Sequence, residues 1–154
     1  MTRGAILVNL LAYSLVVSQP LFYLVAMTSA QRELSAPAYI ELRQRINSVM
    51  TRRISWIYLG ALVMNLILIV LSLLGRDWFL LTTTVVSLLC LGLDIALMMR
   101  ENLPVNGVID RWSPTNYPED WETYRTKWFS IFGYRQVLLV VGFFSLLIGA
   151  VFQT

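Results

Sequence analysis

The sequence lacks histidine altogether and contains only one cysteine in 154 residues. Histidine is the commonest metal ligand and the usual general base near neutral pH, so its absence excludes many metalloenzymes and acid–base enzymes. The single thiol, Cys90, provides neither a disulfide framework nor a cysteine pair for redox or metal chemistry. We therefore expect no metal site and no cofactor.

Charge is also scarce, because only 14% of the residues are charged and 57% are hydrophobic. A soluble domain usually carries about 25% charged residues. The apolar residues form four blocks, at 6–27, 54–74, 79–99 and about 129–152. Each block has the roughly 20 residues that a membrane-spanning helix needs, and in lipid an unbroken apolar span must be helical. The sequence predicts an all-α integral membrane four-helix bundle, with residues 1–154 forming a single transmembrane domain.

The first block follows Arg3, an arrangement that signal peptides share. The hydrophobic segment of a signal peptide has only about 7 to 15 residues, which is shorter than this block. We interpret it as a retained first span.

The basic residues are distributed unevenly between the two sides of the predicted bundle. Ten of the 12 Lys and Arg residues lie in or beside the loops at 28–53 and 100–128, and Arg3 and Arg76 lie on the other side. Cytoplasmic loops of membrane proteins carry the excess of Lys and Arg. This pattern predicts a multi-pass protein with both long loops in the cytoplasm and both termini outside it.

The connections also carry structural signals. Only Gly75 to Trp78 separates the second and third spans, so these helices are expected to be antiparallel neighbours. Residues 36–53 predict a helix that runs into the second span, whereas 101–120 reads as irregular chain with helix resuming near 113–120. Pro20 predicts a kink in the first span.

Tryptophan and arginine alternate along the start of the fourth helix. Their spacing of three or four residues places them on one helical face, which comprises Trp121, Arg125, Trp128, Phe132 and Arg135. Such a face fits either a helix at the membrane interface or the wall of a pocket that binds an aromatic anion.

Four polar side chains fall within the predicted spans: Asn9, Gln19, Asn65 and Asp94. Polar groups are costly in hydrocarbon and normally face the bundle interior. At 1.5 Å per residue, Asp94 lies about 8 Å from the cytoplasmic end of its helix. Tyr58, Gln19 and Arg135 are expected at a similar depth and could form a pocket with Asp94. Alternatively, Asp94 forms a structural ion pair with Arg135 or Arg100.

Two segments together resemble a known family. Pro104-Val105-Asn106 after the third span, followed by Trp121, Arg125, Trp128 and Arg135, resembles the small four-span membrane proteins that include the anthrone oxygenases. The resemblance implies oxidation of electron-rich polyphenols by molecular oxygen without a metal or organic cofactor. It also implies that Asn106 orients a substrate oxygen, that Arg125 and Arg135 stabilise a phenolate or superoxide, and that Trp121 and Trp128 stack on substrate rings.

The histidine that often accompanies the tryptophan in those oxygenases has no counterpart in this sequence. Proton removal would then fall to Asp94, Tyr58 or Tyr124. A second resemblance, to the microsomal glutathione transferase family, rests on the four spans, the basic loops and the segment 41–47.

These features leave three functional hypotheses. The first is an oxygenase-like enzyme acting on a lipophilic aromatic substrate, with Asp94, Arg125 and Arg135 as catalytic residues and Gln19, Tyr58, Asn106, Trp121 and Trp128 binding the substrate. The second is a non-catalytic subunit that binds lipid or quinone, or that packs in a homo-oligomer or a larger membrane complex. The third is a glutathione-transferase-like membrane enzyme. The basic residues are too scattered to indicate nucleic-acid binding.

Overall fold

The structure, a computed structural model, describes residues 2–152, apart from the side chains of residues 2, 51 and 52. Arg52, one of the loop cations, is therefore outside the described side chains. The elements run in the order α1 (Thr2–Phe22), η1 (Tyr23–Met27), α2 (Thr28–Arg32), α3 (Ala36–Gly75), α4 (Trp78–Leu97), η2 (Met98–Asn102), α5 (Leu103–Ile109) and α6 (Trp121–Phe152). The two η segments are π-helices.

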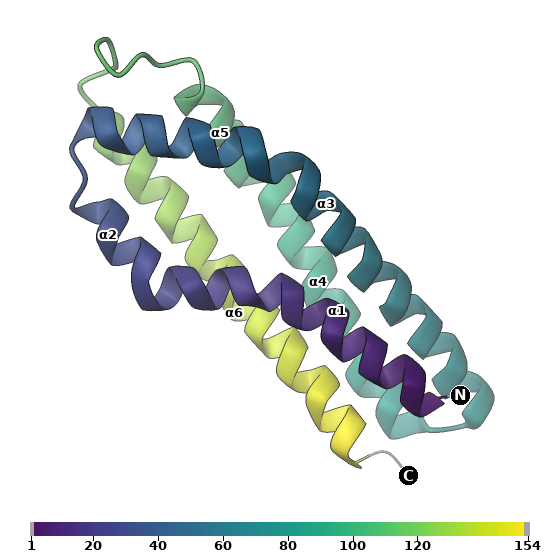
Figure 1. Ribbon diagram of the computed structural model, residues 1–154. Coiled ribbons are helices and arrows are strands. Elements are labelled where there is room, and N and C mark those ends of the chain that lie inside the picture. Colours follow the sequence, from purple (N-terminus) through teal and green to yellow (C-terminus); the bar gives the residue numbers. More distant parts are fainter. Residues whose placement is uncertain (1, 153–154) are drawn as a thin grey trace.

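The four long helices form an antiparallel bundle (Figure 1). Helix α1 packs against α3 and α6, and α4 packs against the same two helices. Four stretches are long and apolar enough to cross a membrane, namely Arg3–Arg32, Arg53–Gly75, Trp78–Ile109 and Trp121–Phe152. The predicted all-α membrane bundle is confirmed, and the chain is a multi-pass membrane protein.

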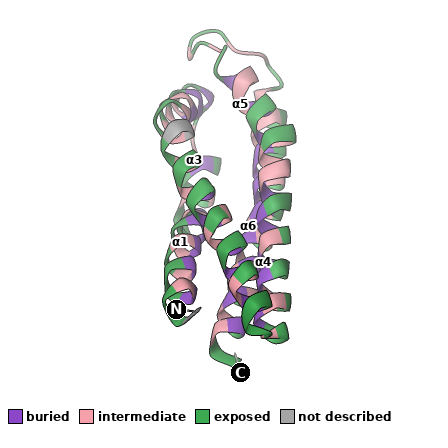
Figure 2. Cartoon of the chain, turned by 90° about the vertical axis from the view of Figure 1, so that its right-hand side faces the viewer, coloured by how far each residue is buried: buried purple, intermediate pink, exposed green. Residues whose placement is uncertain are grey.

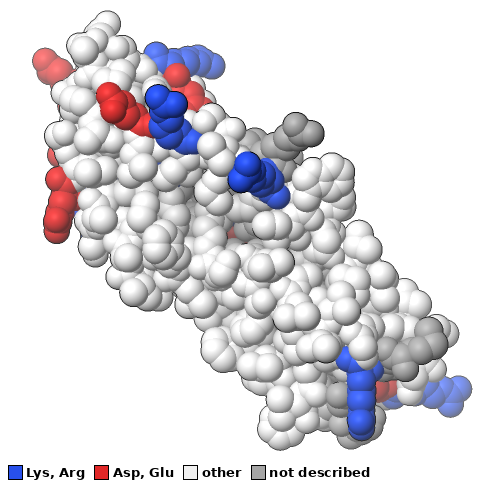
Figure 3. Space-filling view, viewed as in Figure 1, with Lys and Arg blue, Asp and Glu red and all other residues white. Residues whose placement is uncertain are grey.

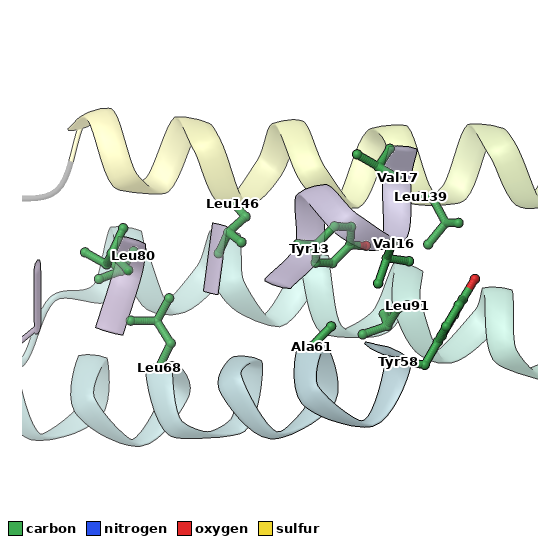
Figure 4. Packing of buried hydrophobic residues seen from close by; sticks show 11 residues of the cluster. Tyr13, Val16, Val17, Tyr58, Ala61, Leu68, Leu80, Leu91, Leu139 and Leu146 are labelled. Carbon is green, nitrogen blue, oxygen red and sulfur yellow. The ribbon is translucent and has the colours of Figure 1, made fainter. Parts of the chain in front are cut away.

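The pattern of buried and exposed side chains is the one expected of a helix bundle surrounded by lipid. Buried residues line the inner faces of the helices, whereas large apolar side chains such as Leu15, Val63 and Val141 point outward, where lipid would surround them (Figure 2). The membrane-centred core contains aliphatic and aromatic side chains from all four helices, including Tyr13, Ala61, Leu91 and Leu139 (Figure 4). Within it, the Asn65 amide donates to the Asn9 side-chain oxygen at 3.1 Å and so joins α3 to α1, while Asn9 Nδ2 and Asn65 Oδ1 have no hydrogen-bond partner.

The short connection between α3 and α4 is as the sequence predicts. Arg76 takes a left-handed conformation, with φ of 58°, and ends α3. The Asp77 carboxylate then accepts the Leu80 N–H at 2.9 Å and caps α4. The start of α1 and the end of α6 lie at this same end of the bundle (Figure 1).

The opposite end, called the loop end below, carries more helix than the sequence indicated. The prediction for residues 36–53 is confirmed, because α3 begins at Ala36 and continues unbroken through the second span. The prediction of irregular chain after the third span is wrong for its first half, which forms η2 and α5. Pro104 sits in the first turn of α5, directly after η2, and the chain stays helical from α4 through η2 into α5.

The prediction that helix resumes near 113–120 is also wrong. Ser113 and Asn116 exchange two backbone hydrogen bonds of 3.1 and 3.0 Å in a tight turn, and α6 starts at Trp121. At Pro20, α1 remains helical to Phe22, and the departure from α geometry comes just afterwards, in η1.

Close packing of α4 and α1 on α6 depends on two glycines. A Cβ atom added at Gly142 would overlap the Tyr13 hydroxyl, and one at Gly149 would overlap the Thr83 hydroxyl. Gly133, on the same helix, has open space around its Cβ position.

We expect Gly142→Ala to lower the free energy of unfolding by about 1–3 kcal/mol, because overpacking forces α1 and α6 apart. Gly133→Ala is the matched control and should be neutral or slightly stabilising, since alanine favours helix. Unfolding by denaturing detergent in mixed micelles measures both. Tyr13→Phe, which removes the overlapping hydroxyl, should restore part of the loss; equal stability of the two glycine variants would contradict this packing argument.

Candidate functional site

A cavity of about 120 Å³ lies inside the loop end of the bundle. It is enclosed by the end of α1, η1, the first half of α3, η2, α5 and α6. Its lining comprises Gln19, Tyr23, Arg43, Ile46, Met50, Ile54, Ser55, Met98, Asn102, Leu103, Asn106, Trp128, Phe132 and Arg135. Four of the predicted site residues therefore line one cavity: Gln19, Asn106, Trp128 and Arg135.

Asp94, Tyr58 and Arg135 form a buried network behind this cavity. The Arg135 Nε and Nη2 atoms donate to the two Asp94 carboxylate oxygens at 2.8 and 3.3 Å. The Tyr58 hydroxyl donates to the same carboxylate at 2.7 Å, and Arg135 Nη1 donates to the Asn102 side chain at 3.0 Å. Asp94 has no exposed surface and Arg135 is 6% exposed. The sequence analysis predicted that these residues lie at one depth, and they do. Their geometry is that of a closed ion pair.

Arg43 is the second guanidinium on the cavity wall, and it lacks such a partner. It is 2% exposed, and its Cζ atom lies 3.9 Å from the centroid of the Trp128 ring. Its Nη2 atom donates to the Asn106 and Asn47 side chains at 2.8 and 3.3 Å. Its Nε atom has no hydrogen-bond partner. Among the described carboxylates, none forms an ion pair with Arg43.

Burial has electrostatic consequences at this end of α3, which lies before the apolar stretch starting at Arg53. Removal from water lowers the pKa of Arg43, against the raising effect of Tyr23, Tyr39 and Asp110 nearby. Burial likewise raises the pKa of Tyr39 to about 12. The Arg43 charge is thus held in a site that favours a negative ligand group, because a buried cation is costly until it is compensated.

The outer part of the tryptophan–arginine face does not reach the cavity. Arg125 Nη1 donates to the backbone carbonyls of Arg32 and Leu34 at 3.0 and 3.2 Å, and its guanidinium lies 4.4 Å from the Trp121 ring centroid. Trp121 packs against Tyr39. These contacts close the turn between α2 and α3, so Trp121 and Arg125 lie apart from the four cavity residues.

Both π-helices border the cavity. The wider turn of η1 contributes Tyr23, whose ring lies 4.7 Å from that of Phe132. The turn of η2 contributes Met98 and Asn102, and the latter bonds Arg135. π-helical turns inside longer helices occur frequently at functional sites.

Sequence reasoning named only four of the cavity residues, and the most consequential omissions are Arg43 and Asn102. Arg43 stands between Arg45 and Glu41 in a charged stretch, which favoured a solvated position. The overlooked signal was its spacing, since Arg43 falls on the same helical face as Tyr39, Ile40 and Met50.

The cavity can bind but offers few means of moving protons. Its described lining contains two guanidiniums, three side-chain amides, a serine and a tyrosine, but no carboxylate. The Asp94 oxygens are already occupied by Tyr58 and Arg135. Among the described residues, no group of three His, Cys, Asp or Glu side chains could hold a metal ion. Such a lining is suited to holding an anionic oxygen beside aromatic rings.

We expect Asp94→Ala to destabilise the fold by about 3–5 kcal/mol, because it leaves Arg135 buried without a counter-charge. Tyr58→Phe removes the hydrogen bond to Asp94 and the longer one from Arg135 Nη2, and it should cost about 1.5–3 kcal/mol. Unfolding in mixed micelles measures both. The double variant Asp94→Asn/Arg135→Gln should cost less than the sum of its two single changes. Additive costs would show that the two residues do not stabilise the fold as a pair.

Comparisons with models of protein families, with curated proteins and with solved structures find no match to this chain.

Proposed function

We propose that this membrane protein binds a lipophilic aromatic molecule through an acidic oxygen, in the cavity at the loop end of the bundle. The observation that carries the proposal is Arg43, a buried guanidinium with an unpartnered Nε atom on the cavity wall. A subunit with a purely structural role has no need for a buried cation beside a cavity that forms no ion pair with a described carboxylate. A phenolate, an acidic quinol or a carboxylate would supply the missing charge.

The walls support an aromatic ligand group. Tyr23, Trp128 and Phe132 line the cavity, and the Trp128 and Phe132 rings are stacked 4.8 Å apart at an angle of 17°. Asn106 already accepts from Arg43 and has its amide N–H groups available for a ligand oxygen, as the family resemblance implies. The volume of about 120 Å³ suits one ring or head group rather than a whole large ligand.

The oxidation of the bound molecule by molecular oxygen is the second candidate. The presence of two guanidiniums beside aromatic walls favours it, because they would stabilise an oxidisable phenolate. The lack of a carboxylate among the described lining residues favours binding over deprotonation within the site. Arg125 and Trp121 would act on such a reaction only indirectly, through the turn that they close.

We also propose that the loop end faces the cytoplasm, as the excess of Lys and Arg in the loops indicates. A Cys90→Ser background with either Thr115→Cys or Gly75→Cys tests this. In intact cells, a membrane-impermeant maleimide should modify the cysteine at 75, beside the short turn, and should reach the one at 115 only after permeabilisation. The reverse pattern would invert the assigned orientation.

Arg43→Gln should weaken the binding of an alkylated naphthol by roughly 30-fold in Kd, which corresponds to about 2 kcal/mol. The guanidinium is then no longer available to the naphtholate oxygen. Titration of the protein in lipid nanodiscs, followed by tryptophan fluorescence, measures the change. Arg45→Gln is the matched control, because it makes the same charge change at an exposed position on the same helix.

The methyl ether of the naphthol provides the ligand control, since it cannot ionise and should bind more weakly than the naphthol. Equal Kd values for Arg43→Gln and the unchanged protein would refute the proposal, and so would equal binding of the ether. An oxygen electrode on the same samples distinguishes the second candidate, because turnover consumes oxygen and binding alone does not.

A further inference from the structure

A second hollow lies on the outer surface next to the cavity. It is lined by Leu15, Ser18, Gln19, Val49, Met50, Arg53, Ile54 and Ile57, from α1 and α3. Gln19, Met50 and Ile54 belong to both linings, so the hollow and the cavity adjoin at these three side chains. The hollow forms a mouth that faces sideways, out of the bundle.

The course of the helices explains why a mouth exists here. Helices α1 and α3 pack closely in the membrane-centred half of the bundle and diverge toward the loop end, where η1 and α2 lead away from α3 (Figure 1). The molecular surface is hollowed between them (Figure 3). Leu15 is 59% exposed and Val49 is 52% exposed at the rim of the mouth, and both would contact lipid.

We infer that the ligand is a single-tailed amphipathic acid with an aromatic head, which reaches the cavity sideways from the bilayer through the mouth between α1 and α3. This inference rests on the proposed binding function and names the ligand class and its route. The acidic head pairs with Arg43 inside the cavity, while the tail lies over Met50 and Ile54 and continues between Leu15 and Val49 into the surrounding lipid.

Size and charge select this class of ligand. The inner cavity, at about 120 Å³, accommodates a head group or one ring, so any longer apolar part must lie outside it. The mouth is apolar apart from Ser18, Gln19 and Arg53, as a hydrocarbon tail requires. Arg53 stands where the apolar stretch of α3 begins, at the level where an anionic head group would approach from the leaflet.

Flexible side chains separate the mouth from the cavity. Methionine is unbranched and adapts its shape easily, so Met50 can move aside for a passing ligand. The Gln19 amide, half-buried between the two hollows, offers polar contact to the head on its way to Arg43.

Photolabelling in lipid nanodiscs tests the route. The probe is a long-chain alkylbenzoate with a diazirine in the part of the tail nearest the ring, and specific labelling is the fraction that an excess of unlabelled alkylbenzoate removes. We expect specific labels on the segments 15–18 and 49–57, with little on the outer faces of α4 and α6. Specific labels confined to those outer faces, or to the 110–120 turn, would overturn the sideways route.

A photoactive phosphatidic acid serves as the two-tailed comparison, and we expect it to give no specific label at the mouth. Specific labelling by both probes would overturn the restriction to one tail.

Variants at the mouth give an independent kinetic test. Val49→Trp, which fills the mouth without touching the cavity lining, should slow specific labelling at least fivefold. Val63→Trp is the matched control on the lipid-facing side of the same helix and should leave the labelling rate unchanged. Equal labelling rates in the two variants would contradict entry of the ligand through the mouth. The thermal unfolding of each variant is measured alongside, so that misfolding is not mistaken for blockage.

The outcomes separate this inference from the proposed function. If naphthol binding does not depend on Arg43, the proposed site itself is refuted. Retained dependence on Arg43, together with unchanged labelling in Val49→Trp, would leave the site in place and reject only the sideways route.

Discussion

The ion pair between Asp94 and Arg135 organises the loop half of this bundle. It joins α4 to α6, and through the Tyr58 hydroxyl and the Asn102 side chain it also holds α3 and η2. In hydrocarbon neither charge is tolerated alone, so each fixes the position of the other. Because four elements meet at this pair, the back wall of the cavity is rigid, and Asp94 is fully engaged in holding it.

The two arginines on the cavity wall contrast in what compensates their charge. Arg135 is neutralised by a carboxylate from a neighbouring helix, whereas Arg43 contacts an aromatic face and two amide oxygens and forms no ion pair with any described carboxylate. A ring face and amide dipoles stabilise a guanidinium less than a carboxylate does. The difference in charge compensation, rather than the number of polar residues, separates the structural ion pair from the site that we propose binds a ligand.

The features that could be predicted from the sequence are those that depend on hydrophobicity or on the spacing of residues along a helix. The four spans, the short turn before Trp78 and the depth of Asp94 and Arg135 follow from those two rules. The place of Arg43 in the cavity could not be predicted in this way, because its local sequence resembles that of exposed Arg45. Only the tertiary contact with Trp128 distinguishes the two arginines. The same limit applies to Arg125, whose spacing matched the cavity residues although its guanidinium binds the carbonyls of Arg32 and Leu34.

The π-helices η1 and η2 were also not predicted from the sequence. They explain why this end of the bundle is open. Each adds a residue to a helical turn and so redirects the chain that follows, which is α2 after η1 and α5 after η2. A bundle of uninterrupted helices could bring large side chains together here and close the core, as it does around Leu68 and Leu146 (Figure 4). With the helices redirected, Tyr23 and Asn102 face a space that Arg43 and Trp128 border from the opposite helices. The departures from regular helix and the buried guanidinium without an ion-pair partner therefore coincide at one place, which is the place where we propose that the ligand binds.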